Sequence, residues 1–256
     1  MKGLKQKLGQ AYTIYGVIIF FLVLIAIFPF FWLVLNIKPL EKYGYSLYKV
    51  WGTSLHWLIG MPINRIYKGS FDKNKQYIFT PNHSSFLDIT AVGSGPFNVT
   101  FLGKIELAKA PLFGYIYKRF NVIVDRKSSV SRKKAVEDCY KLLEEGKSLA
   151  VFPEGTISRK APELMPFKDG AFLMAIEKQV PVVPVTLPFN WHILNGDGRF
   201  IMKWHKLRVV FHEPIDTCGM TKDDIPMLKK KVRSIIEKEL DEQLEEAQIG
   251  KLTTTC

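Results

Sequence analysis

Residues 76–88 have the sequence QYIFTPNHSSFLD, in which a short apolar run leads directly into a histidine and an aspartate. An apolar run of this length is typical of a buried β-strand. His83 and Asp88 are five residues apart, so their side chains can meet if His83 lies in the turn before a helix and Asp88 about one turn inside it. The stretch therefore predicts a strand, a polar turn and a helix, in the order found in an α/β fold.

The same alternation of strands and helices continues along the chain. The predicted strands lie at residues 76–80, 98–102, 121–124, 148–152, 180–187 and 206–212. Helical segments are predicted over residues 86–92, part of 105–120, 130–145, 170–178 and 223–246. Strands that alternate with helices predict an α/β fold with a mostly parallel sheet flanked by helices.

A long apolar segment precedes this α/β part. Between Leu8 and Ile37 there is no charged residue, and about 20 apolar residues suffice to cross the hydrocarbon core of a bilayer. The apolar core of a cleaved signal peptide has only about 7–15 residues. We therefore expect a retained membrane anchor.

A second segment, residues 45–64, contains tryptophans and one charged residue, Lys49, a composition that suits the membrane interface. We expect the two segments to form a helical hairpin that enters one leaflet, and a simple spanning helix is the alternative. Lysines flank the first segment on both sides, which suits a hairpin with both ends in the cytoplasm. The sequence thus predicts a membrane-embedded helical module over residues 1–67. Residues 68–256 would form a catalytic domain that faces the cytoplasm at the inner membrane.

Charge and cysteine content narrow the possible partners. The formal net charge is +12, so the surface should attract polyanions. No zinc-ligand, helix-turn-helix or RNA-binding signature occurs in the sequence, and the apolar segments indicate a lipid bilayer and not nucleic acid as the partner. Cys139, Cys218 and Cys256 are odd in number and far apart, which is typical of reduced thiols and gives no metal-ligand spacing. We expect neither a metal nor a cofactor.

Polar residues follow four of the predicted strands. They are His83 and Asp88, then Lys104, then Asp125 and Arg126, and then Glu154, Gly155 and Thr156. Ligand sites of open α/β sheets form outside the carboxyl ends of the strands. Each cluster alone has an ordinary structural explanation, such as a helix cap, a turn or a surface ion pair. Their shared place at one edge predicts a single site.

The residue types in these clusters are those of a proton-transfer site that binds an anion. A neutral imidazole at His83 can accept a proton from a hydroxyl near pH 7, while a carboxylate at Asp88 orients the ring and stabilises the imidazolium. Lys104 and Arg126 offer cationic donors for a phosphate or a carboxylate. Gly155 would let the backbone approach a ligand closely. A hydroxyl at Thr156 adds a further hydrogen-bonding group.

Four blocks of sequence occur in order between residues 76 and 187. The first is Asn82, His83 and Asp88, the second covers residues 103–114 and ends in 124–126, the third is 152–156, and the fourth is 180–185, preceded by 167–172. Together these blocks closely resemble the lysophosphatidic acid acyltransferase family, the 1-acyl-glycerol-3-phosphate O-acyltransferases. The fourth block reads as a buried strand and is taken as structural.

This resemblance implies transfer of a fatty acyl group from an acyl thioester, acyl-CoA or acyl carrier protein, to the sn-2 hydroxyl of lysophosphatidic acid, which gives phosphatidic acid. His83 would deprotonate the hydroxyl and Asp88 would hold the imidazole, with no acyl-enzyme intermediate. By the same analogy, Lys104, Arg126 and the loop of residues 154–156 would hold the phosphate-bearing acceptor. The acyl thioester is a co-substrate, so the resemblance implies no bound cofactor.

The third block departs from the family pattern at one position. Members of the family commonly carry an arginine directly after the Glu-Gly-Thr triplet, whereas this chain has Ile157 there and its next arginine is Arg159. Two interpretations follow. Arg159 takes the place of that arginine in binding the acceptor, or the acceptor is another lysolipid, such as a lyso-aminolipid.

Two other functions would each account for part of the sequence. A serine lipid hydrolase would account for the serines beside His83, but the Gly-x-Ser-x-Gly motif is missing, and the nearest candidate at residues 93–95 has the wrong spacing. A non-enzymatic protein that binds anionic lipid would account for the lysines and the apolar segments. It would not account for four ordered blocks.

Overall fold

The computed structural model describes every residue except 1, 73, 195–199 and 254–256. Within the described part, seven strands form one sheet in the order β1-β7-β6-β2-β5-β3-β4. The strands are β1 Ile63–Tyr67, β2 Ile78–Pro81, β3 Val99–Lys104, β4 Asn121–Val124, β5 Ser148–Ala150, β6 Val182–Thr186 and β7 Leu207–Phe211. Neighbouring strands are parallel except for β6 and β7. The predicted mostly parallel sheet is confirmed.

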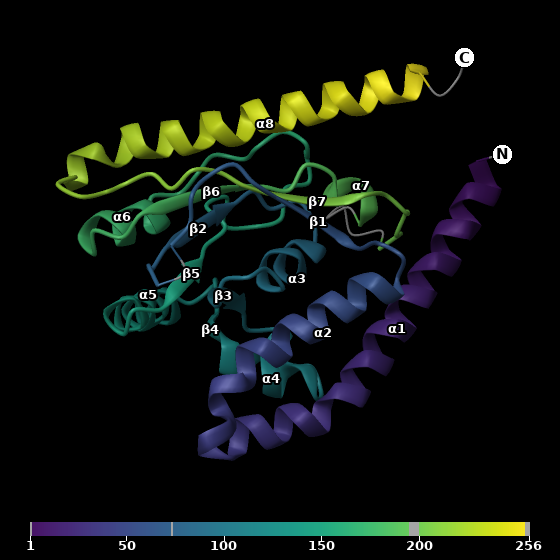
Figure 1. Cartoon of the computed structure of the whole chain (residues 1–256), viewed down its shortest axis with the longest axis horizontal. Helices are drawn as coiled ribbons and strands as arrows, with labels where there is room; N and C mark the ends of the chain where they lie inside the picture. The colour runs from purple at the N-terminus through teal and green to yellow at the C-terminus, as the bar shows by residue number, and fades with distance from the viewer. Residues whose placement is uncertain (1, 73, 195–199, 254–256) are drawn as a thin grey trace.

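Helices cover both faces of this sheet (Figure 1). The α-helices are α1 Lys2–Asn36, α2 Gly44–Leu58, α3 Leu87–Gly93, α4 Phe113–Phe120, α5 Ser129–Glu144, α6 Gly170–Glu177, α7 Asn190–Ile193 and α8 Ile225–Thr253. Short 3-10 helices are η1 Lys38–Tyr43, η2 Leu107–Lys109 and η3 Lys222–Asp224. One face packs against α5, α6 and α8, and the opposite face against α2 and α3. The predicted α/β class is therefore confirmed.

Along each central strand, successive side chains point alternately into the apolar cores on the two faces of the sheet. Ile78 and Val182 pack with α5, α6 and α8, whereas Phe79 and Val183 pack on the other face with α2 and α3. All four side chains are fully buried. Because both faces are covered, the central strands carry apolar residues at successive positions instead of alternating with polar ones. This is why the sequence shows these strands as continuous apolar runs.

The N-terminal helices α1 and α2 run back along each other below the sheet (Figure 1). By length and composition alone, residues 6–36 of α1 would suffice to cross a membrane. Leu24 and Phe31 of α1 are buried against Trp51 of α2, while most of the remaining α1 surface is apolar and exposed. A 35-residue helix is about 52 Å long. The assignment of both helices to a membrane leaflet stays a prediction.

Strand β1 was not predicted. Residues 63–67 lie in the range that we assigned to the N-terminal module, yet they pair in parallel with β7, from Ile63 beside Leu207 to Tyr67 beside Phe211. An edge strand with a partly exposed pattern has a weak local signal, and its pairing partner lies more than 140 residues further along the chain. The division of the chain at residue 67 stays a prediction.

A partly buried polar cluster joins helix α8 to the sheet beside β7. His212 Nε2 lies 2.8 Å from the hydroxyl of Thr186, and Lys68 Nζ lies 2.5 Å from the buried carboxylate of Glu239 on α8. Burial lowers the pKa of His212 to about 4, from its usual 6.5. The folded protein therefore keeps this histidine neutral under conditions in which the unfolded chain protonates it.

We expect this histidine to make the protein less stable in acid. As the pH falls from 6.5 to about 4, the unfolded state binds a proton that the folded state does not, so stability is lost over that window. The free energy of unfolding of the parent should fall by about 3 kcal/mol more than that of His212→Gln, which cannot titrate there. Urea unfolding across this pH range measures the difference. Equal losses in the two proteins would contradict the prediction.

Candidate active site

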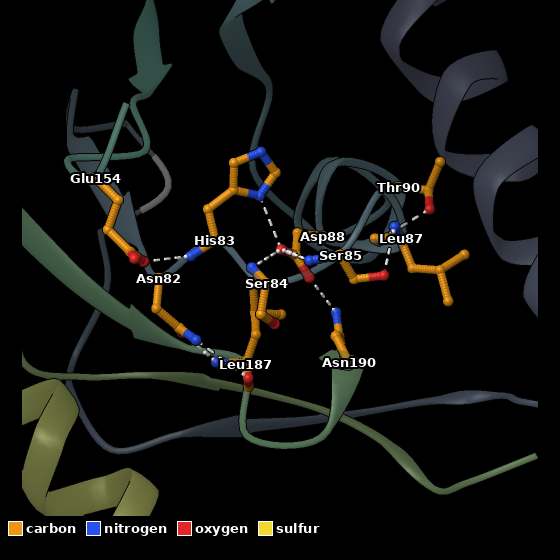
Figure 2. A network of polar contacts seen from close by, with 10 residues as sticks. All are labelled: Asn82, His83, Ser84, Ser85, Leu87, Asp88, Thr90, Glu154, Leu187 and Asn190. Atoms are coloured by element: carbon orange, nitrogen blue, oxygen red, sulfur yellow. Dashed lines mark hydrogen bonds and ion pairs between the residues drawn. The ribbon is translucent and has the colours of Figure 1, made fainter. Parts of the chain in front are cut away.

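The loop between β2 and α3 brings His83 and Asp88 together. β2 ends at Pro81 and α3 begins at Leu87, so Asp88 is the second residue of the helix. His83 Nδ1 lies 2.8 Å from Asp88 Oδ2 (Figure 2). Both side chains are buried, with exposed fractions of 6% and 0%. The five-residue spacing thus places the pair in direct contact.

The Asp88 carboxylate is held by four donors. Oδ2 accepts hydrogen bonds from the backbone amides of Ser84 at 2.7 Å and Ser85 at 2.8 Å as well as from His83. Oδ1 accepts from Nδ2 of Asn190 at 2.7 Å. Such donors favour the ionised form of a buried carboxylate. An ionised oxygen can only accept a hydrogen bond, so His83 Nδ1 carries the proton and Nε2 is left as a base.

The ring of Phe152 holds the imidazole from one side. Its centroid lies 3.9 Å from that of His83 with an interplanar angle of 18°. This stacking and the bond to Asp88 together define the plane and the direction of the ring. Figure 2 shows Nε2 on the side of the ring away from Asp88.

His83 lines a cavity of about 250 Å³. Three cationic side chains line the same cavity: Lys104, Arg126 and Arg159. The remaining lining residues are Phe86, Ile89, Phe101, Leu102, Leu107, Tyr117, Phe152, Thr156 and Ile157. A base, a group of cations and an apolar wall thus share one space, which suits a substrate with an anionic head and an apolar chain.

Sheet topology explains why residues so distant in sequence meet here. β2, β5, β3 and β4 are neighbours and parallel, so their carboxyl ends lie at one edge, as predicted from the motif positions. Lys104 ends β3, and Arg126 follows β4 and donates from Nη1 to the carbonyl of Gly155 at 2.7 Å. Gly155 has φ +72°, a backbone conformation that other residues rarely adopt. This conformation favours glycine in the loop.

Glu154, which we expected among the acceptor-binding residues, points elsewhere. Its Oε1 accepts from the backbone amide of His83 at 2.7 Å, and its Oε2 accepts from that of Met165 at 2.9 Å. The side chain is 2% exposed, and burial raises the pKa of its carboxyl group. The structure places this carboxylate between two segments of backbone instead of in the cavity, where it ties the third block to the histidine turn.

Two side chains of the site carried no functional signal in the sequence. Phe152 lies inside the third block, but nothing local indicates that it stacks on His83. Asn190 lies 102 residues from Asp88, and a lone asparagine after a strand is an ordinary turn residue. Only the packing of β6 beside β2 brings Asn190 to the site.

The serines near His83 are not arranged for nucleophilic catalysis. Ser85 Oγ accepts from the amide of Leu87, and Ser84 Oγ is buried without a partner among the described residues. Ser94, the candidate from residues 93–95, donates to the carbonyl of Thr90 and accepts from Arg65. A serine hydrolase needs its nucleophile bonded to the base, so the hydrolase alternative finds no support in these contacts.

Comparison with known proteins gives one family. The sequence model of the family named Acyltransferase matches residues 64–188. A 1-acyl-sn-glycerol-3-phosphate acyltransferase from Haemophilus influenzae is 29% identical over 76% of this chain and 82% of that protein. One from Limnanthes douglasii is 28% identical over 84% of this chain and 74% of that protein. A chloroplastic relative from Brassica napus is 30% identical over 66% of this chain, which spans about half of that longer protein.

The same fold is found in a solved structure. The crystal structure of the 1-acyl-sn-glycerophosphate (LPA) acyltransferase PlsC from Thermotoga maritima superposes with a TM-score of 0.79 and 23% identity. The superposition covers 95% of this chain and 98% of that one, so the likeness includes the N-terminal helices. With the family match across the site and the ordered blocks that resemble the same enzymes, residues 64–188 belong to the acyltransferase family, and the chain is similar to the 1-acyl-sn-glycerol-3-phosphate acyltransferases.

Proposed function

We propose that this protein transfers a fatty acyl group from an acyl thioester to the sn-2 hydroxyl of lysophosphatidic acid, giving phosphatidic acid. One observation carries the proposal: the Asp88-oriented His83 and three cationic side chains line the same cavity. The printed names of the relatives support the same acceptor. Acyl-CoA and acyl carrier protein both remain possible donors, since each presents the same thioester.

The reaction proceeds by direct transfer. His83 Nε2 takes the proton from the sn-2 hydroxyl, and the alkoxide oxygen attacks the thioester carbonyl. Asp88 stabilises the imidazolium that forms. When the tetrahedral intermediate collapses, the carbon–sulfur bond breaks and the imidazolium returns its proton to the thiolate. The products are the ester and the free thiol, and His83 is again neutral.

The phosphate of the acceptor would be held by the cationic side of the cavity. Lys104 and Arg126 stand at the carboxyl ends of neighbouring strands β3 and β4. Arg159 lines the cavity beside Ile157, which supports the interpretation that Arg159 takes the place of the arginine missing after Thr156. Thr156 offers a hydroxyl on the same wall. Glu154 and Gly155 would act indirectly, by holding this loop in place.

The protein would work at the cytoplasmic surface of the inner membrane. Supporting this, the exposed surface of α1 is largely apolar, while the helix is bonded to the rest of the protein near both ends. The hydroxyl of Tyr12 donates to the carbonyl of Ile59 at 2.5 Å, and Asn36 donates to the hydroxyl of Tyr115 at 2.6 Å. A helix so attached along its length suits a hairpin lying in one leaflet better than a free spanning helix.

A panel of acceptors tests the proposed function. We expect the protein in detergent or vesicles, given one acyl-CoA, to acylate lysophosphatidic acid far more efficiently than 1-monoacylglycerol, which has the same hydroxyl and no phosphate. Lys104→Ala should raise KM for lysophosphatidic acid about 10-fold, because a charge-assisted hydrogen bond is lost. Release of the thiol and formation of phosphatidic acid are measured together.

The control is Lys141→Ala on α5, an exposed lysine on a helix that covers the opposite face of the sheet from α3. This variant should behave like the parent. If the protein prefers a lyso-ornithine lipid to lysophosphatidic acid, the proposed acceptor is wrong and the proposed acyl-transfer chemistry still holds. If thiol is released without any acylated lipid, the protein is a thioesterase and the proposal is wrong.

A further inference from the structure

Asn190 lies outside the four blocks, and it also lies beyond the segment 64–188 that matches the family. It is the first residue of α7, which follows β6. Its side chain is fully buried and donates from Nδ2 to Asp88 Oδ1 at 2.7 Å (Figure 2). We propose that Asn190 is a positioning residue of this acyltransferase, which keeps Asp88 turned so that Oδ2 faces His83.

The two oxygens of Asp88 have unequal support. Oδ2 accepts from three donors, one of them His83, whereas Asn190 is the donor to Oδ1 among the described residues. The torsion that turns a carboxylate is soft, and a buried carboxylate oxygen without a donor is costly. Without Asn190, the carboxylate would therefore turn toward other partners. This change weakens its hold on the imidazole.

The segment that carries Asn190 is itself fastened to the histidine turn. Asn82, the residue before His83, accepts from the amide of Leu187 at 2.7 Å and donates to its carbonyl at 3.2 Å. Two amide side chains thus connect the turn after β2 to the segment after β6. The Asn82 side chain fixes the backbone of the segment, and the Asn190 side chain fixes Asp88. The position of Asn190 is therefore set by the active-site turn that it supports.

The sharpest variant is Asn190→Asp, which keeps the shape and replaces the donor by a carboxyl group. When protonated, the new carboxyl group can donate to Asp88 Oδ1 in place of the amide. When ionised, it places a second negative charge beside Asp88, which is strongly unfavourable in a buried site. His83, which contacts Asp88, and Glu154, which accepts from the backbone amide of His83, are the other ionisable groups nearby, and both are present in all the variants. An added alkaline decline in kcat would therefore come from the new group.

The experiment measures kcat, both KM values and the pH profile of kcat with lysophosphatidic acid and one acyl-CoA. Asn190→Ala should lower kcat about 10- to 100-fold with KM changed by less than about 2-fold, because a misplaced base affects the chemical step and not binding. Asn190→Asp should show a decline of kcat toward alkaline pH that the parent and Asn190→Ala lack.

Asn121→Ala is the matched control. Asn121 is also buried and donates one hydrogen bond from Nδ2, to the carbonyl of Tyr117 at 2.8 Å. Its Oδ1 has no partner in the part of the chain that the structure describes. The Asn121→Ala variant should be less stable than the parent but keep the parental kcat per folded molecule. Parental kcat in folded Asn190→Ala, or pH profiles of one shape in all variants, would overturn the positioning role. This inference rests on the proposed function, and the two fail differently: no acyl transfer by the parent would reject the function itself.

Discussion

Replacing His83 with alanine is expected to lower acyl transfer by roughly 10²- to 10⁴-fold, because the variant lacks the base that takes the proton from the acceptor hydroxyl. Binding should change little, since the cationic residues and the apolar wall of the cavity remain in place. The loss should therefore appear in kcat, with KM for both substrates close to the parental values.

The variant should still fold. The turn around His83 is held by backbone bonds that alanine keeps: the amide donates to Glu154, and the carbonyl accepts from the amide of Ser158. His205→Ala is the matched control, because that histidine is only partly buried and lies outside the cavity. An inactive His205→Ala, or a His83→Ala protein that keeps near-parental turnover, would contradict the assignment of the base.

Replacing Asp88 with asparagine is expected to lower kcat by roughly 10²- to 10⁴-fold while leaving the structure of the site in place. A neutral amide cannot stabilise the imidazolium as a carboxylate does. In the parent, the backbone amides of Ser84 and Ser85 donate to Oδ2 of Asp88, and the amide oxygen of the variant can still accept both hydrogen bonds. Its NH₂ group would take the place of Oδ1, which now faces Nδ2 of Asn190. Once the amide of Asn190 turns over, this NH₂ group can donate to Oδ1 of Asn190, which has no partner among the described residues.

This compensation makes Asp88→Asn a test of charge and not of packing. Asp88→Ala serves as the comparison, because it removes the charge and also leaves four donors unpaired. We expect both variants to lose kcat, and Asp88→Ala alone to lose a large part of its unfolding free energy as well. Near-parental kcat in Asp88→Asn would show that the carboxylate charge is not needed.

Much of the fold followed from local patterns. The strands near residues 78, 99, 121, 148, 182 and 207 were predicted within a few residues of their ends, because strands buried on both faces form apolar runs that periodicity detects. The edge strand β1 and the four-residue helix α7 were missed. Each is short and takes its stability from a partner distant in sequence, so neither has a local signal of its own.

The candidate site also has a part that the sequence predicts and a part that it does not. His83 and Asp88 could be paired from the sequence because the contact spans five residues and a helix start determines where the second side chain lies. Lys104 and Arg126 could be placed at the same edge because parallel strands share their carboxyl ends. The partners of the Glu154 and Asn190 side chains could not be predicted, because hydrogen bonds between distant segments depend on which strands become neighbours.

For this protein, the sequence by itself determined the order of strands and helices, the proton-transfer pair and the cations expected beside it. Only the tertiary structure decided that β1 joins the sheet in parallel beside β7, that Glu154 holds the histidine turn, and that Asn190 reaches Asp88. The physical reason is the distance along the sequence over which each interaction acts. Periodicity and turn chemistry act over a few residues, whereas these contacts join segments 71 to 144 residues apart and exist only once the sheet has formed.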